Sequence, residues 1–436
     1  MNSCPICTEQ FNNDHVLHFQ QAHKSYTLLK CPACECLFYK DNFVFDFKNN
    51  IDHNKSLKIY LEKNADIEGL VTLIYNFLSQ LPKATKGIDI GCGAGLVMDF
   101  AAAFMTKEMI GFEPSLYYSR EGKENLNLNI IDDFFSSDYL QDDKQDFAIC
   151  LQVLQMSNSP ATLLKDIFKS LNNNGILLLT TPDNNVIHSD QDILNNLPAL
   201  SPGVHRIIYS ETSLIAALKN AGFKHVKVYK RNNTLFALAS PGALPDIDLF
   251  LPNRDIVVQY YELKLTTLEK NSSYYKGIWY RYFRNKIDYG EYDSALQILL
   301  NTTWFEVWSE NEIEEINSYE SLFELNTFSD AIIYYYIGIL LLNYLQRTHF
   351  SEKFFLLSYL LCKKIIQIQP ENCPLESDIL WHAKLNYLIA KTQNGQIAEV
   401  KNELIAFLTI DKSLEKLPTP SVEIKKLADA MLKNIA

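Results

Sequence analysis

The stretch that decides the fold is Gly87-Ile88-Asp89-Ile90-Gly91-Cys92-Gly93-Ala94-Gly95. Its first four residues are typical of a short buried strand, and residues 96–104 continue with the apolar spacing of a helix. Glycine is needed between the two elements because the chain turns tightly there and lets a ligand approach the backbone. A glycine turn between a strand and a helix is typical of cofactor-binding α/β sheets.

An acidic residue completes the cofactor pattern. Gly111-Phe112-Glu113-Pro114 places Glu113 at the end of the second expected strand, about twenty residues after the glycine turn. A carboxylate there can accept both ribose hydroxyls of an adenosine. Leu96 stands where the third glycine of a dinucleotide-binding turn would be, which argues against an oxidoreductase of the same fold.

Residues 46–244 alternate short apolar runs with amphipathic stretches, the pattern of a parallel sheet with crossover helices. Gly175 is expected to end a helix in a left-handed C-cap, and the last two strands to form an antiparallel pair at the sheet edge. The expected strands are 87–90, 109–112, 128–131, 147–151, 176–180, 226–229 and 234–239, and the expected helices are 57–81, 96–104, 161–171 and 213–220.

From Lys86 to Phe223 the chain resembles the class I S-adenosyl-L-methionine-dependent methyltransferases, particularly their ubiquinone- and sugar-methylating members. The matching segments are the glycine turn, Gly111-Phe112-Glu113-Pro114, Asp132-Asp133-Phe134, Gln145-Asp146-Phe147, Leu171-Asn172-Asn173-Asn174-Gly175, Thr181-Pro182-Asp183 and Ala221-Gly222-Phe223. The resemblance implies a Rossmann-like seven-stranded α/β methyltransferase sheet, enzymatic activity of this class and S-adenosyl-L-methionine as the cofactor.

The resemblance also implies how the cofactor would be held. Gly91, Gly93 and Gly95 would line its methionine and ribose part. Asp89, at the end of the first strand, would help to hold the amino end, and Glu113 would bind the ribose.

Further cofactor contacts follow from the same resemblance. Asp133 would lie near the adenine amino group, with Asp132 as the alternative, and Phe134 would lie against the ring. Gln152 would border the methionine portion. Related enzymes often carry Glu-His after the fourth strand, whereas this chain has Val153-Leu154-Gln155-Met156, so the usual general base is missing.

His205 is the best substitute for this base, since methyl transfer to a hydroxyl benefits from one. It lies in Val204-His205-Arg206-Ile207-Ile208-Tyr209-Ser210, and a role in packing or substrate contact is the alternative. Arg206 could bind a phosphate or carboxylate, or be a surface arginine. His188 is a weaker candidate for the base.

Residues 1–45 are rich in cysteine and histidine. Cys4-Pro5-Ile6-Cys7 and Cys31-Pro32-Ala33-Cys34 have the two-residue spacing that lets both thiolates of a knuckle bind one tetrahedral zinc ion. The sequence therefore predicts a zinc ribbon with Cys4, Cys7, Cys31 and Cys34 as ligands of a structural Zn2+, which supplies the folding free energy of so small a module. Cys36 is expected to be a spare.

A Cys2His2 site is the alternative ligand set. His15, His18 and His23 lie between the knuckles. A zinc finger would need its first histidine about 12 residues after Cys7, near Gln20, and no histidine stands there.

Residues 245–436 show apolar residues three and four apart and no strand-like alternation, so we expect an all-α domain. Segments 279–300, 334–370 and 381–408 resemble tetratricopeptide helix pairs. Such pairs could bind a protein partner. They could equally pack only on the enzyme or mediate homo-oligomer formation.

The 436 residues carry a formal net charge of −12, which gives no electrostatic reason to expect a nucleic-acid partner. The chain opens without a secretory signal, and the apolar run 332–345 is too short to span a membrane. A cytoplasmic location with reduced cysteines is the resulting expectation.

Three functions remain open. A small molecule, sugar or glycan precursor is the leading expectation for the acceptor, because zinc ribbons precede this fold in related sugar methyltransferases. The alternatives are a protein methyltransferase that recruits its substrate through the helical domain, and a non-catalytic scaffold.

Overall fold

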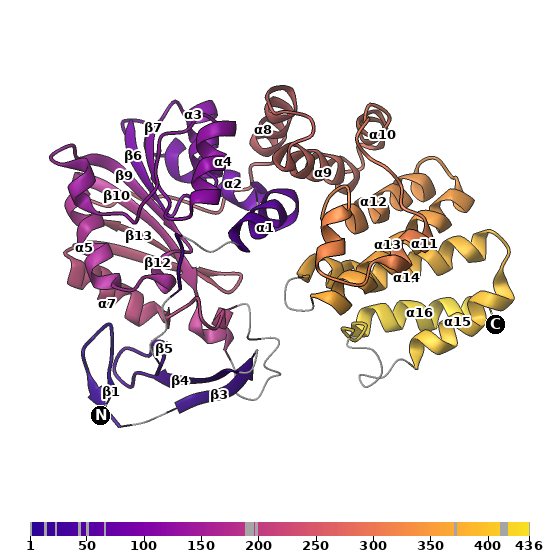
Figure 1. Ribbon diagram of the computed structural model, residues 1–436, viewed down its shortest axis with the longest axis horizontal. Helices are drawn as coiled ribbons and strands as arrows, with labels where there is room; N and C mark the ends of the chain where they lie inside the picture. Colours follow the sequence, from indigo (N-terminus) through magenta and orange to yellow (C-terminus); the bar gives the residue numbers. More distant parts are fainter. Residues whose placement is uncertain are drawn as a thin grey trace. The chain divides into compact units, whose positions relative to one another are not determined.

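The computed structural model describes residues 2–12, 15–21, 24–41, 45–48, 52–64, 67–187, 196, 199–369, 373–409 and 417–435. The chain packs into two compact units (Figure 1). The first unit contains Met1–Leu57 and Asp66–Tyr260, and the second contains Lys58–Ala65 and Tyr261–Ala436. The expected domain ranges 1–45, 46–244 and 245–436 stay a prediction.

A seven-stranded sheet forms the centre of the first unit, in the order β12-β13-β10-β9-β6-β7-β8. Strands β6, β7, β8, β9 and β10 pair with one another in parallel, and β13 runs antiparallel to both β10 and β12. This Rossmann-like sheet with its antiparallel edge pair confirms the predicted fold class. The bounds are β6 Lys86–Ile90, β7 Glu108–Phe112, β8 Ile130–Ile131, β9 Gln145–Leu151, β10 Leu171–Pro182, β12 His225–Arg231 and β13 Thr234–Ser240.

Helices cover both faces of this sheet (Figure 1). On one face lie α2 Ile67–Ser79, α3 Leu96–Met105 and α4 Leu116–Asn125, and on the other lie α5 Pro160–Ser170 and α7 Glu211–Ala221. The strand order reverses between β6 and β9, because β7 follows on one side of β6 and β9 and β10 lie on the other. Ligands of open α/β sheets bind at such a switch point, outside the carboxyl ends of the strands.

Two expected details are wrong. Helix α5 ends at Ser170, and β10 already begins at Leu171, so Gly175 lies inside a strand and is no C-cap. Its small size matters instead, because a Cβ there would lie 2.9 Å from the Leu171 Cβ and 3.0 Å from the Gln145 carbonyl oxygen. The expected helix 57–81 is divided into α1 Asp52–Ile59, the π-helical turn η1 Tyr60–Asn64 and α2.

The N-terminal segment forms a second, small sheet in the order β11-β5-β4-β3. β3 His15–Gln21, β4 Lys24–Lys30 and β5 Leu37–Tyr39 come from the N-terminus, whereas β11 Ile207–Ile208 comes from the segment after β10. Ile207 pairs with Phe38 and Ile208 with Leu37. β1 Asn2–Ser3 and β2 Gln10–Phe11 form a separate short hairpin.

Beyond β13 the described chain is helical, as expected. α9 and α10, α12 and α13, and α14 and α15 are the pairs expected from the sequence, and Gly290 and Gly395 take left-handed φ angles of 72° and 84° at two of the turns. No helix among the described residues is long and apolar enough to cross a membrane. The bounds are α8 Arg254–Thr267, α9 Ser273–Asp288, α10 Tyr292–Leu300, α11 Glu310–Glu315, α12 Asp330–Asn343, α13 Thr348–Ile368, α14 Pro374–Gln393, α15 Ile397–Leu408 and α16 Val422–Ile435.

The π-helical turn η1 belongs to the second unit and contains two buried ionisable residues, Glu62 and Lys63. The Glu62 carboxylate accepts hydrogen bonds from the Ser273 hydroxyl and the Phe328 N–H, both at 2.9 Å. The Lys63 ammonium lies 2.7 Å from the Glu376 carboxylate, and both side chains are 0% exposed. Each charge of this ion pair is stable inside the protein only because the other compensates it.

Removing one partner of the Lys63–Glu376 pair should therefore cost more than removing both. We expect Glu376→Gln to lower the free energy of unfolding of the second unit by roughly 3–5 kcal/mol, because the Lys63 charge stays buried without its partner. The double variant Lys63→Met/Glu376→Leu should recover most of this loss in calorimetric unfolding. Glu423→Gln, on the exposed side of α16, is the matched control; an equal effect of both single variants would contradict the prediction.

Candidate functional site

A pocket of about 340 Å³ opens at the carboxyl ends of β6, β7 and β9, where the strand order reverses. We call it the donor pocket. It contains four of the predicted cofactor residues, namely Gly91, Glu113, Phe134 and Gln152. Its lining consists of Phe47, Ile90, Gly91, Phe112, Glu113, Pro114, Phe134, Phe135, Leu151, Gln152, Val153, Met156, Ser157, Asn158, Ser159, Thr162, Leu163 and Asp166.

The glycine turn between β6 and α3 borders the pocket through Gly91. Gly91, Gly93 and Gly95 all have left-handed φ angles, of 67°, 55° and 79°. A Cβ at Gly91 would lie 2.4 Å from Val153 Cγ2, and one at Gly95 would lie 2.3 Å from Leu128 Cδ1. The turn therefore requires glycine at these two positions for both conformation and space.

Glu113 fastens this turn to the end of β7. Its carboxylate accepts hydrogen bonds from the Gly93 N–H at 2.9 Å and from the Ser115 N–H at 2.8 Å. Burial raises the pKa of Glu113, and the two backbone N–H groups oppose this shift. A carboxylate has about four lone-pair positions, so Glu113 can accept further hydrogen bonds from a pair of hydroxyls.

Asp89 is buried next to Glu113, with 3% of its surface exposed. Its Oδ2 atom has no hydrogen-bond partner among the described residues. Burial, and secondly the charge of Glu113, raise the pKa of Asp89 to about 8. A buried carboxyl oxygen that no described residue contacts by a hydrogen bond suits a cationic ligand, whose charge would favour the ionised form.

Aromatic side chains form the rim of the donor pocket. Phe134 is 49% exposed, and its ring lies 6.3 Å from that of Phe47. The Lys48 ammonium, 5.7 Å from the Phe134 ring centre, is 2.6 Å from the Asp133 carboxylate. Exposed aromatic faces of this kind can stack on a flat heterocycle.

The two aspartates predicted near the adenine do not line the pocket. Asp133 binds Lys48 and the Tyr139 hydroxyl, and the Lys48 ammonium and this hydroxyl lower its pKa to about 2. Asp132 binds the Lys123 ammonium at 2.6 Å. Their assignment to the adenine stays a prediction.

Gln152 follows β9 in a left-handed conformation with a φ of 56°. Its N–H donates to the Thr180 carbonyl at 3.0 Å, and its side-chain oxygen accepts from the Gln155 amide at 3.0 Å. Strained non-glycine residues cluster at binding sites. Gln152 is therefore a pocket-lining residue with a strained backbone conformation, as expected of a residue that contacts a ligand.

His205 lines neither the donor pocket nor the other cavities near it. It is 8% exposed, and its Nδ1 atom lies 2.8 Å from the Ala199 carbonyl oxygen. Since a carbonyl only accepts, Nδ1 carries the proton, and burial lowers the pKa of the ring. A catalytic role for His205 stays a prediction, and His188 lies outside the described residues.

Sequence reasoning missed the pocket residues contributed by Phe47 and by the start of α5. Asp166 and Thr162 lie one turn apart on that helix, and Met156 and Ser157 precede it. No local motif marks them, because only the fold brings α5 and the segment around Phe47 to the glycine turn.

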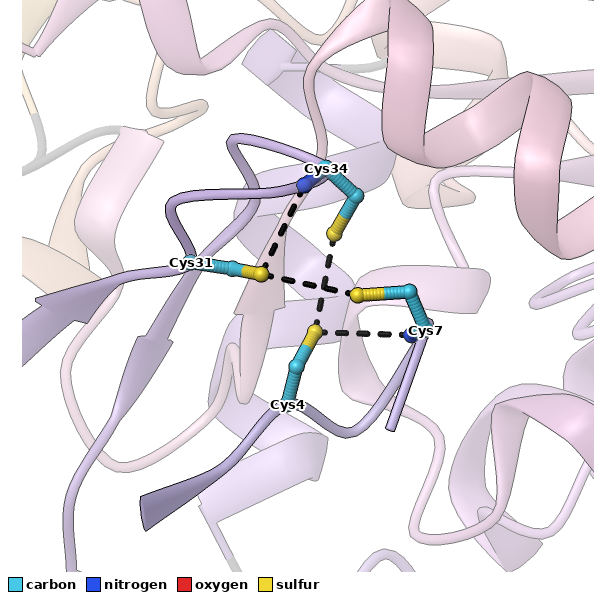
Figure 2. Close-up of side chains that lie close together, drawn as sticks. All are labelled: Cys4, Cys7, Cys31 and Cys34. Carbon is cyan, nitrogen blue, oxygen red and sulfur yellow. Dashed lines mark hydrogen bonds between the residues drawn. The ribbon is translucent and has the colours of Figure 1, made fainter. Parts of the chain in front are cut away.

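The N-terminal segment gathers four sulfur atoms into one cluster. Figure 2 shows the Cys4, Cys7, Cys31 and Cys34 side chains pointing toward a common centre, with all four Sγ atoms within 4.8 Å of one another. The Cys4–Cys34 and Cys7–Cys31 sulfur pairs are each 3.5 Å apart. Tetrahedral zinc with bonds of about 2.3 Å separates its sulfurs by about 3.8 Å, so the cluster has the dimensions of a metal site.

The two knuckles have the same construction. The Thr8 N–H donates to the Cys4 carbonyl and the Glu35 N–H to the Cys31 carbonyl. Thr8 and Glu35 take left-handed φ angles of 63° and 62°. This repetition supports a site built by both knuckles together.

Of the other residues considered as metal ligands, Cys36 lies beside the four-sulfur cluster and His18 does not. Cys36 lies close, with its sulfur 3.6 Å from those of Cys4 and Cys34. The His18 ring instead faces the Thr27 hydroxyl at 3.0 Å. His23 and the side chain of His15 lie outside the described residues.

Comparison with known proteins agrees with the fold. The family model described as a methyltransferase domain matches residues 64–228. A SAM-dependent methyltransferase from Thermotoga maritima is similar in structure, with a TM-score of 0.35 and 17% identity over 44% of this chain and 96% of that one. The match to the family model confirms the predicted resemblance to methyltransferases of this class.

Curated relatives share part of this region. A tRNA U34 carboxymethyltransferase of Sulfurovum sp. (strain NBC37-1) is 33% identical over 98 residues, 21% of this chain and 33% of that protein. The protein of the same name from Sulfurimonas denitrificans is 27% identical over 161 residues, 35% of this chain and 53% of that protein. The chain thus spans between a third and about half of the length of these relatives.

These relatives correct two expectations. The predicted small-molecule, sugar or glycan acceptor and the predicted absence of a nucleic-acid partner are wrong, because the matching relatives are named for tRNA. The net charge of −12 was the misleading observation. It sums over the whole chain, whereas a nucleic acid responds to the charges at its own binding site.

The raised pKa of Asp89 predicts how stability depends on pH. Between about pH 4 and pH 8 the unfolded chain ionises this carboxyl while the folded protein keeps it protonated, so wild type loses stability as pH rises. Asp89→Asn cannot titrate. We expect its stability advantage over wild type to grow by roughly 3–5 kcal/mol from pH 4 to pH 8 in chemical denaturation. Asp142→Asn, an exposed control, should show no such trend, and a pH-independent gap for Asp89→Asn would refute the assignment.

Proposed function

We propose that this chain, whose residues 64–228 form a class I methyltransferase domain, methylates a tRNA with S-adenosylmethionine as the donor. The observation that carries the proposal is that relatives named for tRNA modification match the domain that builds the donor pocket. The acceptor nucleoside we propose is a uridine of the anticodon loop, the position given in the relatives' names. A tRNA substrate implies that the protein acts in the cytoplasm, and we propose this location.

The donor pocket fits S-adenosylmethionine, which supplies a methyl group on a positively charged sulfonium. Glu113 would accept the two ribose hydroxyls while its bonds to Gly93 and Ser115 hold it in place. Asp89 is the carboxyl group that would hold the cationic amino end. Phe134, half exposed at the rim, would cover the adenine ring.

The charges of the pocket favour a methyl over a carboxymethyl group. A carboxymethyl donor carries an extra carboxylate next to the transferred carbon, which a cation would have to neutralise. No Lys or Arg stands among the described residues that line the donor pocket, and two of these residues are the acids Glu113 and Asp166. Lys48 at the rim is already bound to Asp133. We therefore expect this chain to transfer a methyl group, whereas the relatives are named for transfer of a carboxymethyl group.

In this reaction His205 would hold the turn before Arg206 in place rather than take part in proton transfer. Its N–H donates to the Ser201 carbonyl at 3.0 Å, and its ring holds the Ala199 carbonyl. These contacts fix the turn that precedes Arg206. A role as general base would require its second ring nitrogen to reach the acceptor, and the contacts of His205 support the positioning role better.

The four cysteines would bind one structural Zn2+. The thiols of Cys34 and Cys36 lower the pKa of the Cys4 thiol, whereas burial raises the pKa of Cys7, so a bound cation would be needed to hold all four ligands as thiolates. The metal would replace a hydrophobic core that so short a segment cannot build. The ribbon would then depend on zinc for its fold.

The donor assignment is tested with Glu113→Ala. Each lost charge-assisted hydrogen bond is worth about 1.5–3 kcal/mol, so calorimetric titration should show S-adenosylmethionine binding weakened at least tenfold. Methyl transfer to tRNA transcripts should fall in parallel. Glu124→Ala on the exposed side of α4 is the matched control and should behave as wild type. If the wild-type protein bound the donor but methylated no tRNA, the proposed acceptor would be wrong.

The zinc assignment is tested by comparing two cysteine variants. Purified wild-type protein should contain one zinc per chain by elemental analysis. Cys31→Ser should lose it, because Cys31 is one of the four clustered ligands, while Cys36→Ser should retain it. Loss of zinc from Cys36→Ser with retention in Cys31→Ser would reverse the ligand assignment.

A further inference from the structure

The N-terminal ribbon is fixed to the methyltransferase domain rather than tethered to it. Strand β11 extends the ribbon sheet through its pairing with β5. The Asn184 amide donates to the Glu35 carbonyl at 2.7 Å, and the Ser210 hydroxyl donates to the Cys34 carbonyl at 2.8 Å. Both accepting carbonyls belong to the second knuckle. The ribbon is thus a fixed wall on this side of the domain.

A cavity of about 160 Å³ lies between this wall and the domain. We call it the ribbon cavity. Ser157 and Asn158 line both the ribbon cavity and the donor pocket, so the two spaces adjoin. The lining of the ribbon cavity consists of Ser3, Pro5, Phe38, Tyr39 and Asp41 from the ribbon side and Ser157, Asn158, Pro160, Arg206 and Ile207 from the domain.

Arg206 is the only Lys or Arg among the described residues that line the ribbon cavity. Its backbone is held on both sides, since its N–H donates to the Gln155 carbonyl at 2.8 Å and its carbonyl accepts from the Tyr39 N–H at 3.3 Å. Burial lowers the pKa of the guanidinium, which still stays charged because the ordinary pKa of arginine is so high. Asp41 is the acidic residue of the same lining, and a bound phosphate would form charge-assisted hydrogen bonds with Arg206.

We propose that the ribbon cavity binds the acceptor nucleotide, with Arg206 holding a phosphate group beside the target base. This inference rests on the proposed function. The target base must lie next to the donor methyl group, and the shared residues Ser157 and Asn158 place the ribbon cavity at that point. The planar guanidinium fork matches phosphate oxygens in a bidentate geometry.

The surroundings explain why one arginine matters. The chain carries a net charge of −12, so RNA meets overall repulsion and depends on local cations. Unpaired loop nucleotides can turn out of their stack into such a cavity. The ribbon would then be part of the acceptor site.

The test uses the full-length protein and a fluorescent anticodon stem–loop RNA with uridine at position 34. We expect Arg206→Ala to weaken stem–loop binding about tenfold to a hundredfold, the loss typical of a charge-assisted hydrogen bond. The slope of log Kd against log salt should fall by about one, as for a single phosphate contact. Arg206→Lys keeps the charge but not the fork and should fall between wild type and Arg206→Ala.

Arg120→Ala is the matched control, since it removes an exposed arginine of the same domain that forms an ion pair with its helical neighbour Glu124. Both variants should bind S-adenosylmethionine as wild type does. Equal stem–loop affinity of Arg206→Ala and Arg120→Ala would overturn the ribbon-cavity site while leaving the proposed function standing. An affinity loss without a change in salt slope would overturn the phosphate assignment. Wild-type protein that neither binds nor methylates the stem–loop would overturn the proposed function and this inference together.

Discussion

The left-handed turn at Gly91, Gly93 and Gly95 is the constraint on which the first unit depends. It lies at the reversal of strand order and starts α3, and its backbone N–H at Gly93 anchors Glu113 at the end of β7. Val153 and Leu128 leave no space for side chains at two of the three positions. One local backbone conformation thereby fixes the wall of the donor pocket at Gly91, the start of α3 and the position of the Glu113 carboxylate.

The active region combines buried carboxyl groups with one arginine in the adjoining cavity. Two buried carboxyl groups, Asp89 and Glu113, lie at the carboxyl ends of β6 and β7, where a cationic donor would bind. Arg206 lies in the adjoining cavity, where an anionic acceptor would bind. In the proposed complex the two reactants would meet at Ser157 and Asn158, which line both spaces. This arrangement also shows why the net charge of the chain is a poor guide to its partner, because the charges that matter are few and local.

Local patterns in the sequence were enough to predict the strands of the large sheet, the glycine turn, the position of Glu113 at the end of β7 and the clustering of the two cysteine knuckles. Each of these signals lies within a few residues of chain. The contributions of Phe47 and Asp166 to the donor pocket could not be predicted, because they depend on which distant segments the fold brings together. The sequence indicates Arg206 as a candidate ligand for a phosphate or carboxylate, but its place beside the ribbon could not be read from the sequence. The misplaced C-cap at Gly175 has a different origin: a glycine needed for close packing in a strand has the same sequence signature as one that ends a helix.

The pairing of β5 with β11 has a consequence for the order of folding. The ribbon's cysteines lie within the first 36 residues, but its sheet is complete only when Ile207 and Ile208 have joined it. During synthesis the N-terminal segment must wait, with an unpaired strand edge, until about 170 further residues have left the ribosome and the large sheet has placed β11. Early metal capture by the knuckles would shield this segment during the delay, so zinc would protect the nascent chain from aggregation before it supports the finished enzyme.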